Sequence, residues 1–293
     1  MRVLQPSWQL SVASAAALAA LALLGRRSRS PRWRTAGAFG QEFALVMSLL
    51  AVWQLVGSVV HTREAGAMER ARGIFAAERS LHVVSEVDVQ RLVLPHAWLV
   101  EGVDRFYAYA HLNGMAVFLV LMWWRCREVY PALRLTVVLS TLACLLVQIV
   151  PVAPPRLLPD LGFVDVALVR GESVYGPYGT GLSNQLSAMP SVHVAWACIV
   201  AWYLWWNTGP LIRWAGPTHL TLTVLAVVAT ANHWWLDGVV AAGFVALALA
   251  AGRMTPWRTV RASPPRSPSG SSSPRGLAPA ASSPASSSPA ARS

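Results

Sequence analysis

Seven apolar segments dominate this sequence, and most of them are long enough to cross a lipid bilayer. A helix needs about 20 consecutive apolar residues to span the hydrocarbon core. The sixth segment is short unless it begins near Trp214. The segments cover residues 8–24, 39–60, 106–124, 133–150, 190–206, 220–231 and 234–251. The sequence therefore predicts an all-α protein, a polytopic bundle of about six to seven transmembrane helices.

Composition supports the membrane class. Hydrophobic residues make up 55% of the chain and charged residues 13%, which leaves too little polar surface to cover a soluble core. The net charge of +11 resides in short clusters beside apolar segments, where such charges set membrane orientation, so we expect no nucleic-acid partner. All 24 basic residues are arginine, which excludes a lysine from any catalytic or phosphate-binding role.

The arginine clusters also predict the orientation of the helices, because cytoplasmic loops are rich in basic residues. With the amino terminus outside, every cluster between segments falls on the cytoplasmic side. The cluster after the first segment is the reverse of a signal peptide's charge order, so this segment is expected to stay in the membrane. The clusters comprise Arg26, Arg27, Arg29, Arg32 and Arg34, then Arg125, Arg127 and Arg134, and finally Arg213.

The chain divides into three predicted regions. Residues 1–36 form a first span with a basic cytoplasmic linker, residues 37–253 a membrane-embedded domain, and residues 254–293 a disordered Ser/Pro/Ala-rich cytoplasmic tail. The long polar connection 61–105 carries apolar residues at helical spacing, which predicts an amphipathic helix on the external membrane surface. These residues are Ile74, Ala77, Leu81, Val84 and Val87.

Polar side chains at the ends of the last apolar segments are candidates for chemistry. His233 and Asp237 are four residues apart and share one face of a helix. A carboxylate in this position can orient an imidazole and stabilise its charged form, which makes histidine a nucleophile or a base. A structural hydrogen bond between the two is the alternative.

Two further elements could bind an anion. Pro190 is suited to the first turn of a helix, where free N–H groups and the Ser191 hydroxyl could hold phosphate while His193 protonates a leaving oxygen. Arg156, in a proline-rich segment, offers a planar fork that matches phosphate oxygens. The alternatives are a capped helix with no ligand and an arginine on lipid headgroups. All these residues fall on the predicted outer face, which favours one phosphoryl-transfer site there.

Three short motifs carry a family resemblance. They resemble the signature motifs of the type-2 phosphatidic acid phosphatase superfamily, and the first is similar to that of the inositol phosphorylceramide synthase-like branch. The motifs are Ala153-Pro154-Pro155-Arg156, Met189-Pro190-Ser191-Val192-His193 and Asn232-His233-Trp234-Trp235-Leu236-Asp237.

The resemblance implies a metal-independent enzyme with a phosphohistidine intermediate. His233 would attack phosphorus, and Asp237 would orient the His233 ring. His193 would protonate the departing oxygen, and Arg156 and Ser191 would hold the phosphoryl oxygens. No cofactor or metal is implied. The commoner third motif of the superfamily has Ser-Arg where this chain has Ala226 and Val227. One phosphate-binding arginine is therefore missing or supplied elsewhere.

The sequence also gives expectations for the substrate, the acceptor and the cellular location. We expect a lipid phosphate or pyrophosphate substrate and an acceptor that is water or an alcohol, in an integral plasma membrane protein of bacterial type whose site faces the extracytoplasmic side. Two other classes fit the residue types: a transporter that relays protons through its histidines and aspartate, and a metal-dependent membrane hydrolase with His193, His233 and Asp237 as ligands. Nothing in the sequence indicates an oligomeric state.

Overall fold

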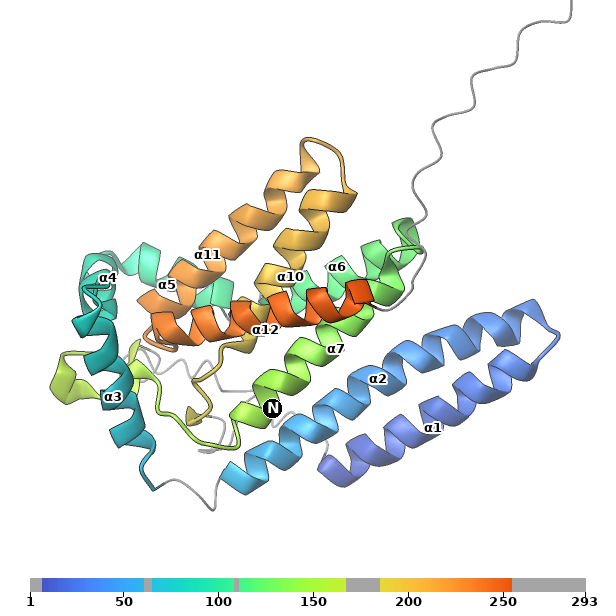
Figure 1. Cartoon of the computed structure of the whole chain (residues 1–293), viewed down its shortest axis with the longest axis horizontal. Coiled ribbons are helices and arrows are strands. Elements are labelled where there is room, and N and C mark those ends of the chain that lie inside the picture. The colour runs from blue at the N-terminus through green and yellow to red at the C-terminus, as the bar shows by residue number, and fades with distance from the viewer. Residues whose placement is uncertain (1–6, 61–64, 108–110, 167–184, 255–293) are drawn as a thin grey trace, which may run out of the picture. The chain divides into compact units, whose positions relative to one another are not determined.

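The computed structural model describes residues 7–60, 65–107, 111–166 and 185–254, which fold almost entirely into helices (Figure 1). Within these residues no strand forms, and an isolated β-bridge pairs Val152 with Ser187. The prediction of an all-α protein is therefore confirmed. Of the predicted tail, 254–293, the described residues include only Met254, which ends the last helix.

The first two helices form an antiparallel hairpin, drawn in blue in Figure 1: α1 (Trp8–Arg27) and α2 (Pro31–Val60). Glycine makes their close approach possible, because a Cβ on Gly25 would lie only 2.5 Å from the Cα of Gly37. Small residues at helix contacts are typical of membrane bundles. Many large apolar side chains of the hairpin are exposed, as expected for a surface that faces lipid.

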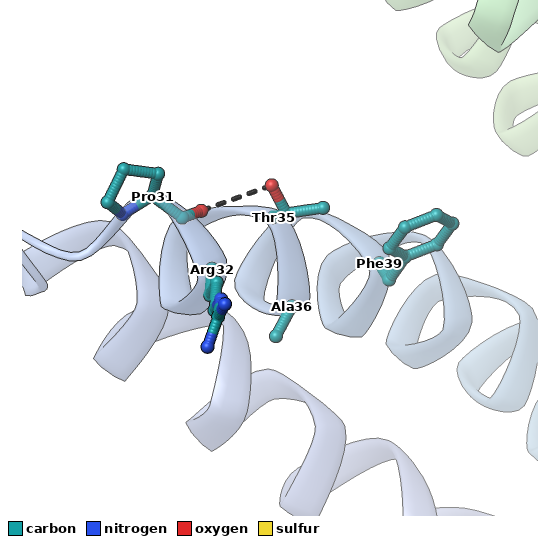
Figure 2. Close-up of a pocket in the computed structure, with 5 residues that line it drawn as sticks. All are labelled: Pro31, Arg32, Thr35, Ala36 and Phe39. Carbon is teal, nitrogen blue, oxygen red and sulfur yellow. Dashed lines mark hydrogen bonds between the residues drawn. The ribbon is translucent and has the colours of Figure 1, made fainter.

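Figure 2 shows an open pocket on the first turns of α2. Its lining consists of Pro31, Arg32, Thr35, Ala36 and Phe39. The Thr35 hydroxyl donates a hydrogen bond of 3.1 Å to the Pro31 carbonyl and is therefore engaged within its own helix. None of the five candidate site residues lines this pocket.

Five further helices pack around the larger of two apolar cores in the described residues: α6 (His111–Arg125), α7 (Tyr130–Val147), α10 (Val192–Asn207), α11 (Ala215–Ala229) and α12 (Trp235–Met254). α12 contacts α7 and α10, and α10 also contacts α11. Their shared core contains buried apolar residues from all five helices, among them Phe118, Leu133, Ile199, Val227 and Val245.

A polar contact joins α2 to α7. Glu42 lies within the apolar α2, where a lone carboxylate would be costly. Its two oxygens accept hydrogen bonds from Arg134 at 2.6 Å and from the Tyr130 hydroxyl at 2.9 Å. The charge of Glu42 is therefore paired within the bundle.

Four of the described helices are long and apolar enough to cross a membrane: α1, α2, α7 and α12. This finding agrees with a membrane protein. α6, α10 and α11 have 15, 16 and 15 residues, or roughly 23–24 Å of helix, against a hydrocarbon core about 30 Å thick. The expected six to seven spans are therefore not established by helix length.

Three short helices connect α2 to α6: α3 (Ala67–Ser80), α4 (Glu86–Val93) and α5 (Ala97–Arg105). Ile74 and Ala77 lie on α3 and Val87 lies on α4, so the five apolar residues at helical spacing do not share a single helix. α3 ends in a Schellman motif, in which His82 has a φ of 56° and the Val83 N–H bonds the Glu78 carbonyl at 3.2 Å. Leu81 and Val84 consequently lie outside both helices and are exposed.

Candidate active site

His233 and Asp237 meet at the beginning of α12. α11 ends at Ala229, and residues 230–234 form the connection that carries His233. Asp237 lies in the first turn of α12, where its Oδ2 accepts the Trp234 N–H at 2.8 Å and lies 3.2 Å from His233 Nδ1. The same carboxylate thus caps the helix and contacts the imidazole, and its side chain is fully buried.

Hydrogen bonding defines the tautomer of the His233 ring. Nδ1 lies 2.8 Å from the carbonyl oxygen of Ala188, which can only accept a hydrogen bond. Nδ1 must therefore carry the proton and donate it to the acceptors around it. In the neutral ring this leaves the lone pair on Nε2, which is the nitrogen directed away from Asp237.

His193 occupies the other side of that ring. Its Nδ1 lies 3.3 Å from His233 Nε2, and the two ring centroids are 5.4 Å apart. Because Nε2 holds the lone pair, His193 Nδ1 is the donor in this contact. The Tyr107 ring lies 4.7 Å from the His193 ring and restricts its orientation. A reacting phosphorus would have to separate the two imidazoles in order to reach Nε2.

Ser191 connects the same two helices. It is the N-cap of α10: its Oγ accepts the Val194 N–H at 3.3 Å, and its own N–H donates to the Asp237 carbonyl at 3.2 Å. The expectation that Pro190 occupies the first helical turn is wrong, because α10 begins at Val192. Ser191 is the capping residue, and Pro190 lies before it, outside the helix. The Ser191 hydroxyl hydrogen remains available for an acceptor.

Arg156 reaches the site from the segment after α7. It lies in the short 3-10 helix η2 (Pro155–Leu157), and its N–H donates to the Ala231 carbonyl at 2.9 Å. Its buried guanidinium donates from Nη1 to Asn232 Oδ1 at 2.9 Å and lies 3.5 Å from Asp165 through Nε. The contacts with Ala231 and Asn232 place this guanidinium beside the residue that precedes His233.

Trp234 joins the segment that carries Arg156 to the turn that carries His233. Its ring is almost fully buried and packs against Phe75 and Phe163, with centroid distances of 6.0 and 5.7 Å. Its indole N–H donates to the Ala153 carbonyl at 3.0 Å. Trp234 thereby ties the segment that carries Arg156 to the turn that carries His233.

The structure brings all five sequence-predicted residues together. His233 contacts both His193 and Asp237, Ser191 joins through its backbone, and Arg156 joins through Asn232. Sequence reasoning assigned no role to the Ala188 carbonyl, Asn232 or Asp165. Of these three, only Asn232 could have been found from the sequence, because it precedes His233 in one of the three motifs.

The site occupies the ends of helices remote from the arginine clusters. α7 begins near Arg134 and leads to Arg156 at its other end, and α11 begins after Arg213 and leads to His233. α10 runs in the opposite direction, from the site toward Arg213. The helix order therefore keeps the predicted cytoplasmic charges away from the candidate residues.

We expect Arg156→Lys to lower kcat/KM by about 100-fold or more, the effect of losing one donor aimed at a developing charge. A single ammonium cannot bond Asn232 and present a planar fork to phosphate oxygens at once. Steady-state kinetics measure the change. Arg72→Lys, at an exposed ion pair with Asp160, is the matched control and should behave as wild type. Unchanged kinetics of Arg156→Lys would remove Arg156 from the site.

One family of known proteins matches this chain. The sequence profile of the PAP2 superfamily matches residues 72–251, a region that begins in α3, ends in α12 and contains all five candidate residues. No curated protein and no solved structure shows significant similarity to the chain. The match covers more than half of the 293 residues, and the chain therefore belongs to the PAP2 superfamily.

Proposed function

We propose that this protein is a metal-independent lipid phosphate phosphatase or phosphotransferase that works through a phosphohistidine. Membership in the PAP2 superfamily indicates a phosphatase or phosphotransferase. The nucleophile, the order of the steps and the lipid substrate are our inference from the site. The inositol phosphorylceramide synthase-like branch, suggested by the motif that ends at Arg156, is part of this proposal.

The contact that carries the proposal is the one between His233 Nδ1 and the Ala188 carbonyl. It keeps the proton on Nδ1 and the lone pair on Nε2, where an attack on phosphorus needs it. Asp237 stabilises the positive charge that develops on the ring as the nitrogen–phosphorus bond forms. The two fixed acceptors on Nδ1 support His233, rather than His193, as the nucleophile.

His193 is in position to be the proton donor. In the first step, His233 Nε2 forms a bond to phosphorus and the bond from phosphorus to the leaving oxygen breaks, while His193 in its imidazolium form transfers one proton to that oxygen and becomes neutral. In the second step, neutral His193 removes a proton from water or an alcohol, which attacks the phosphohistidine and frees His233. The Arg156 fork and the Ser191 hydroxyl would hold the phosphoryl oxygens in both steps.

The geometry favours this mechanism over a metal-dependent one. Asp237 contacts the Nδ1 side of the His233 ring, and His193 contacts the Nε2 side. The three side chains therefore do not converge on one point, as the ligands of a single ion must. Transition-state charge would instead be met by fixed donors.

The proposed topology places the site at the extracytoplasmic surface of a plasma membrane. Six to seven helices would cross the bilayer, with α6, α10 and α11 extended across the interface by their flanking residues. The separation of the arginine-rich helix ends from the site supports this orientation. Membrane lipids would then deliver the substrate laterally.

The experiment that tests the function uses purified protein and a lipid phosphate labelled on phosphorus. We expect the label to appear in free phosphate, or in a new lipid when inositol, sugar or lipid alcohols are added, with equal rates in the presence of a chelator. Turnover that a chelator stops would favour the metal-dependent hydrolase. No release or transfer of the label from any lipid phosphate or pyrophosphate would refute the proposal.

A further inference from the structure

The first turn of α12 is bonded by three buried carboxyl groups. The N–H groups of residues 234, 235 and 236 each donate to a different acidic side chain, at 2.8 Å to Asp237, 3.1 Å to Glu86 and 2.7 Å to Glu78. The exposed fractions of these acids are 0%, 1% and 4%. Glu78 belongs to α3 and Glu86 begins α4, so the connecting helices reach directly to the helix that carries Asp237.

Three ionised carboxylates at one buried helix start would be electrostatically unfavourable. The helix terminus offers only about half a positive charge, and burial penalises each negative charge further. Glu78 and Glu86 accept hydrogen bonds from adjacent N–H groups of one helix turn, which brings their two carboxyl groups side by side, and two ionised carboxylates so placed would repel each other. Glu78 Oε2 is buried and receives no hydrogen bond from the described residues, so it is the atom suited to hold a proton.

We propose that Glu78 and Glu86 share one proton and act as a positioning pair that fixes the first turn of α12, and with it the contact between Asp237 and His233. The pair leaves Asp237 as the ionised group beside the imidazole. This role rests on the proposed function of His233 as the nucleophile. Neither glutamate touches the reacting atoms.

The titration of Glu78 agrees with this arrangement. Burial and the neighbouring acids Glu86 and Asp237 raise the pKa of Glu78 to about 9, against the opposing effect of the hydrogen bond from the Leu236 N–H. The charged groups that act on Glu78 are thus Glu86 from α4 and Asp237 from α12, both acids. As pH rises through about 9, the shared proton is lost, the acids repel one another and activity should fall.

Glutamine substitutions test the shared proton, because an amide imitates a protonated carboxyl group. In Glu78→Gln or Glu86→Gln the amide donates to the remaining carboxylate, so kcat should stay close to wild type. In the double variant two amide NH2 groups face each other, and we expect kcat to fall about 100-fold through misplacement of Asp237, with little change in KM. Glu69→Gln, an exposed change on α3, is the matched control.

Two readouts separate positioning from a merely structural role. The alkaline limb of the wild-type pH–rate profile near pH 9 should disappear in each single variant, because the shared proton is replaced by an amide. Infrared difference spectra between wild type and Glu78→Gln at neutral pH should contain the carbonyl band of a protonated carboxyl group, which should vanish above pH 9.

The outcomes are decisive in both directions. Absence of that infrared band, an alkaline limb unchanged in both single variants, or equal losses in single and double variants would overturn the pair. If the double variant does not fold, the single variants and the infrared band decide alone. If wild type turns over no lipid phosphate, the proposed function fails, while the infrared band still tests the shared proton.

Discussion

His233→Ala is expected to abolish turnover and, with it, any covalent phosphoenzyme. Loss of a nucleophile that acts as a unit with its partner groups lowers kcat by on the order of 10⁶-fold in a well-studied hydrolase. The alanine also removes the ring whose Nδ1 is held by Ala188 and Asp237. Rapid quenching with phosphorus-labelled substrate, followed by alkaline work-up that preserves phosphohistidine, should show labelled wild-type protein and unlabelled variant.

His96→Ala is the matched control for this experiment. His96 is exposed at the start of α5, where its side chain makes no capping hydrogen bond. This variant should form the phosphoenzyme at the wild-type rate. Label that remains on His233→Ala protein would show that another residue is the nucleophile, and His193 would then be the first to examine.

His193→Ala is expected to have the second largest effect, and its size should depend on the leaving group. General acid catalysis contributes about 10²- to 10⁴-fold, and the contribution is largest when the leaving oxygen is a poor leaving group. We therefore expect a large loss with an alkyl phosphate and a much smaller loss in the first step with an aryl phosphate that carries an alkyl chain. Single-turnover kinetics with the two substrates measure the difference.

The same variant should also accumulate the intermediate. With an aryl phosphate, His193→Ala retains the Nε2 nucleophile but lacks the base that activates water, so labelled phosphohistidine should build up beyond its wild-type level. Equal losses with alkyl and aryl substrates and no accumulation would contradict the assignment of His193 as the acid and base. His193 would then have only the role of supporting the His233 ring.

Much of the fold was predictable because apolar composition and arginine clusters act locally along the chain. α1, α2, α7 and α12 lie where apolar segments predicted them, since a bilayer-length apolar run has few other stable conformations. The break after α3 was not predictable from periodicity. It depends on His82 in the left-handed region and on a Schellman motif that competes with the continuing helix.

The candidate site shows the same division. The spacing of His233 and Asp237 predicted that they lie close together, although His233 lies just before α12 and not on it. The chemistry of a helix start and of a guanidinium selected Ser191, His193 and Arg156, and the motif resemblance then gave them roles. Their mutual contacts, the proton on Nδ1 and the acids that bond α12 were decided by the tertiary structure. The physical reason is that the partners are a backbone carbonyl at Ala188 and carboxylates from α3 and α4. Every residue has a backbone carbonyl, and a distant glutamate has no characteristic spacing in the sequence. Only the packed chain therefore shows which carbonyl accepts a hydrogen bond from the imidazole and which glutamates accept from the start of α12.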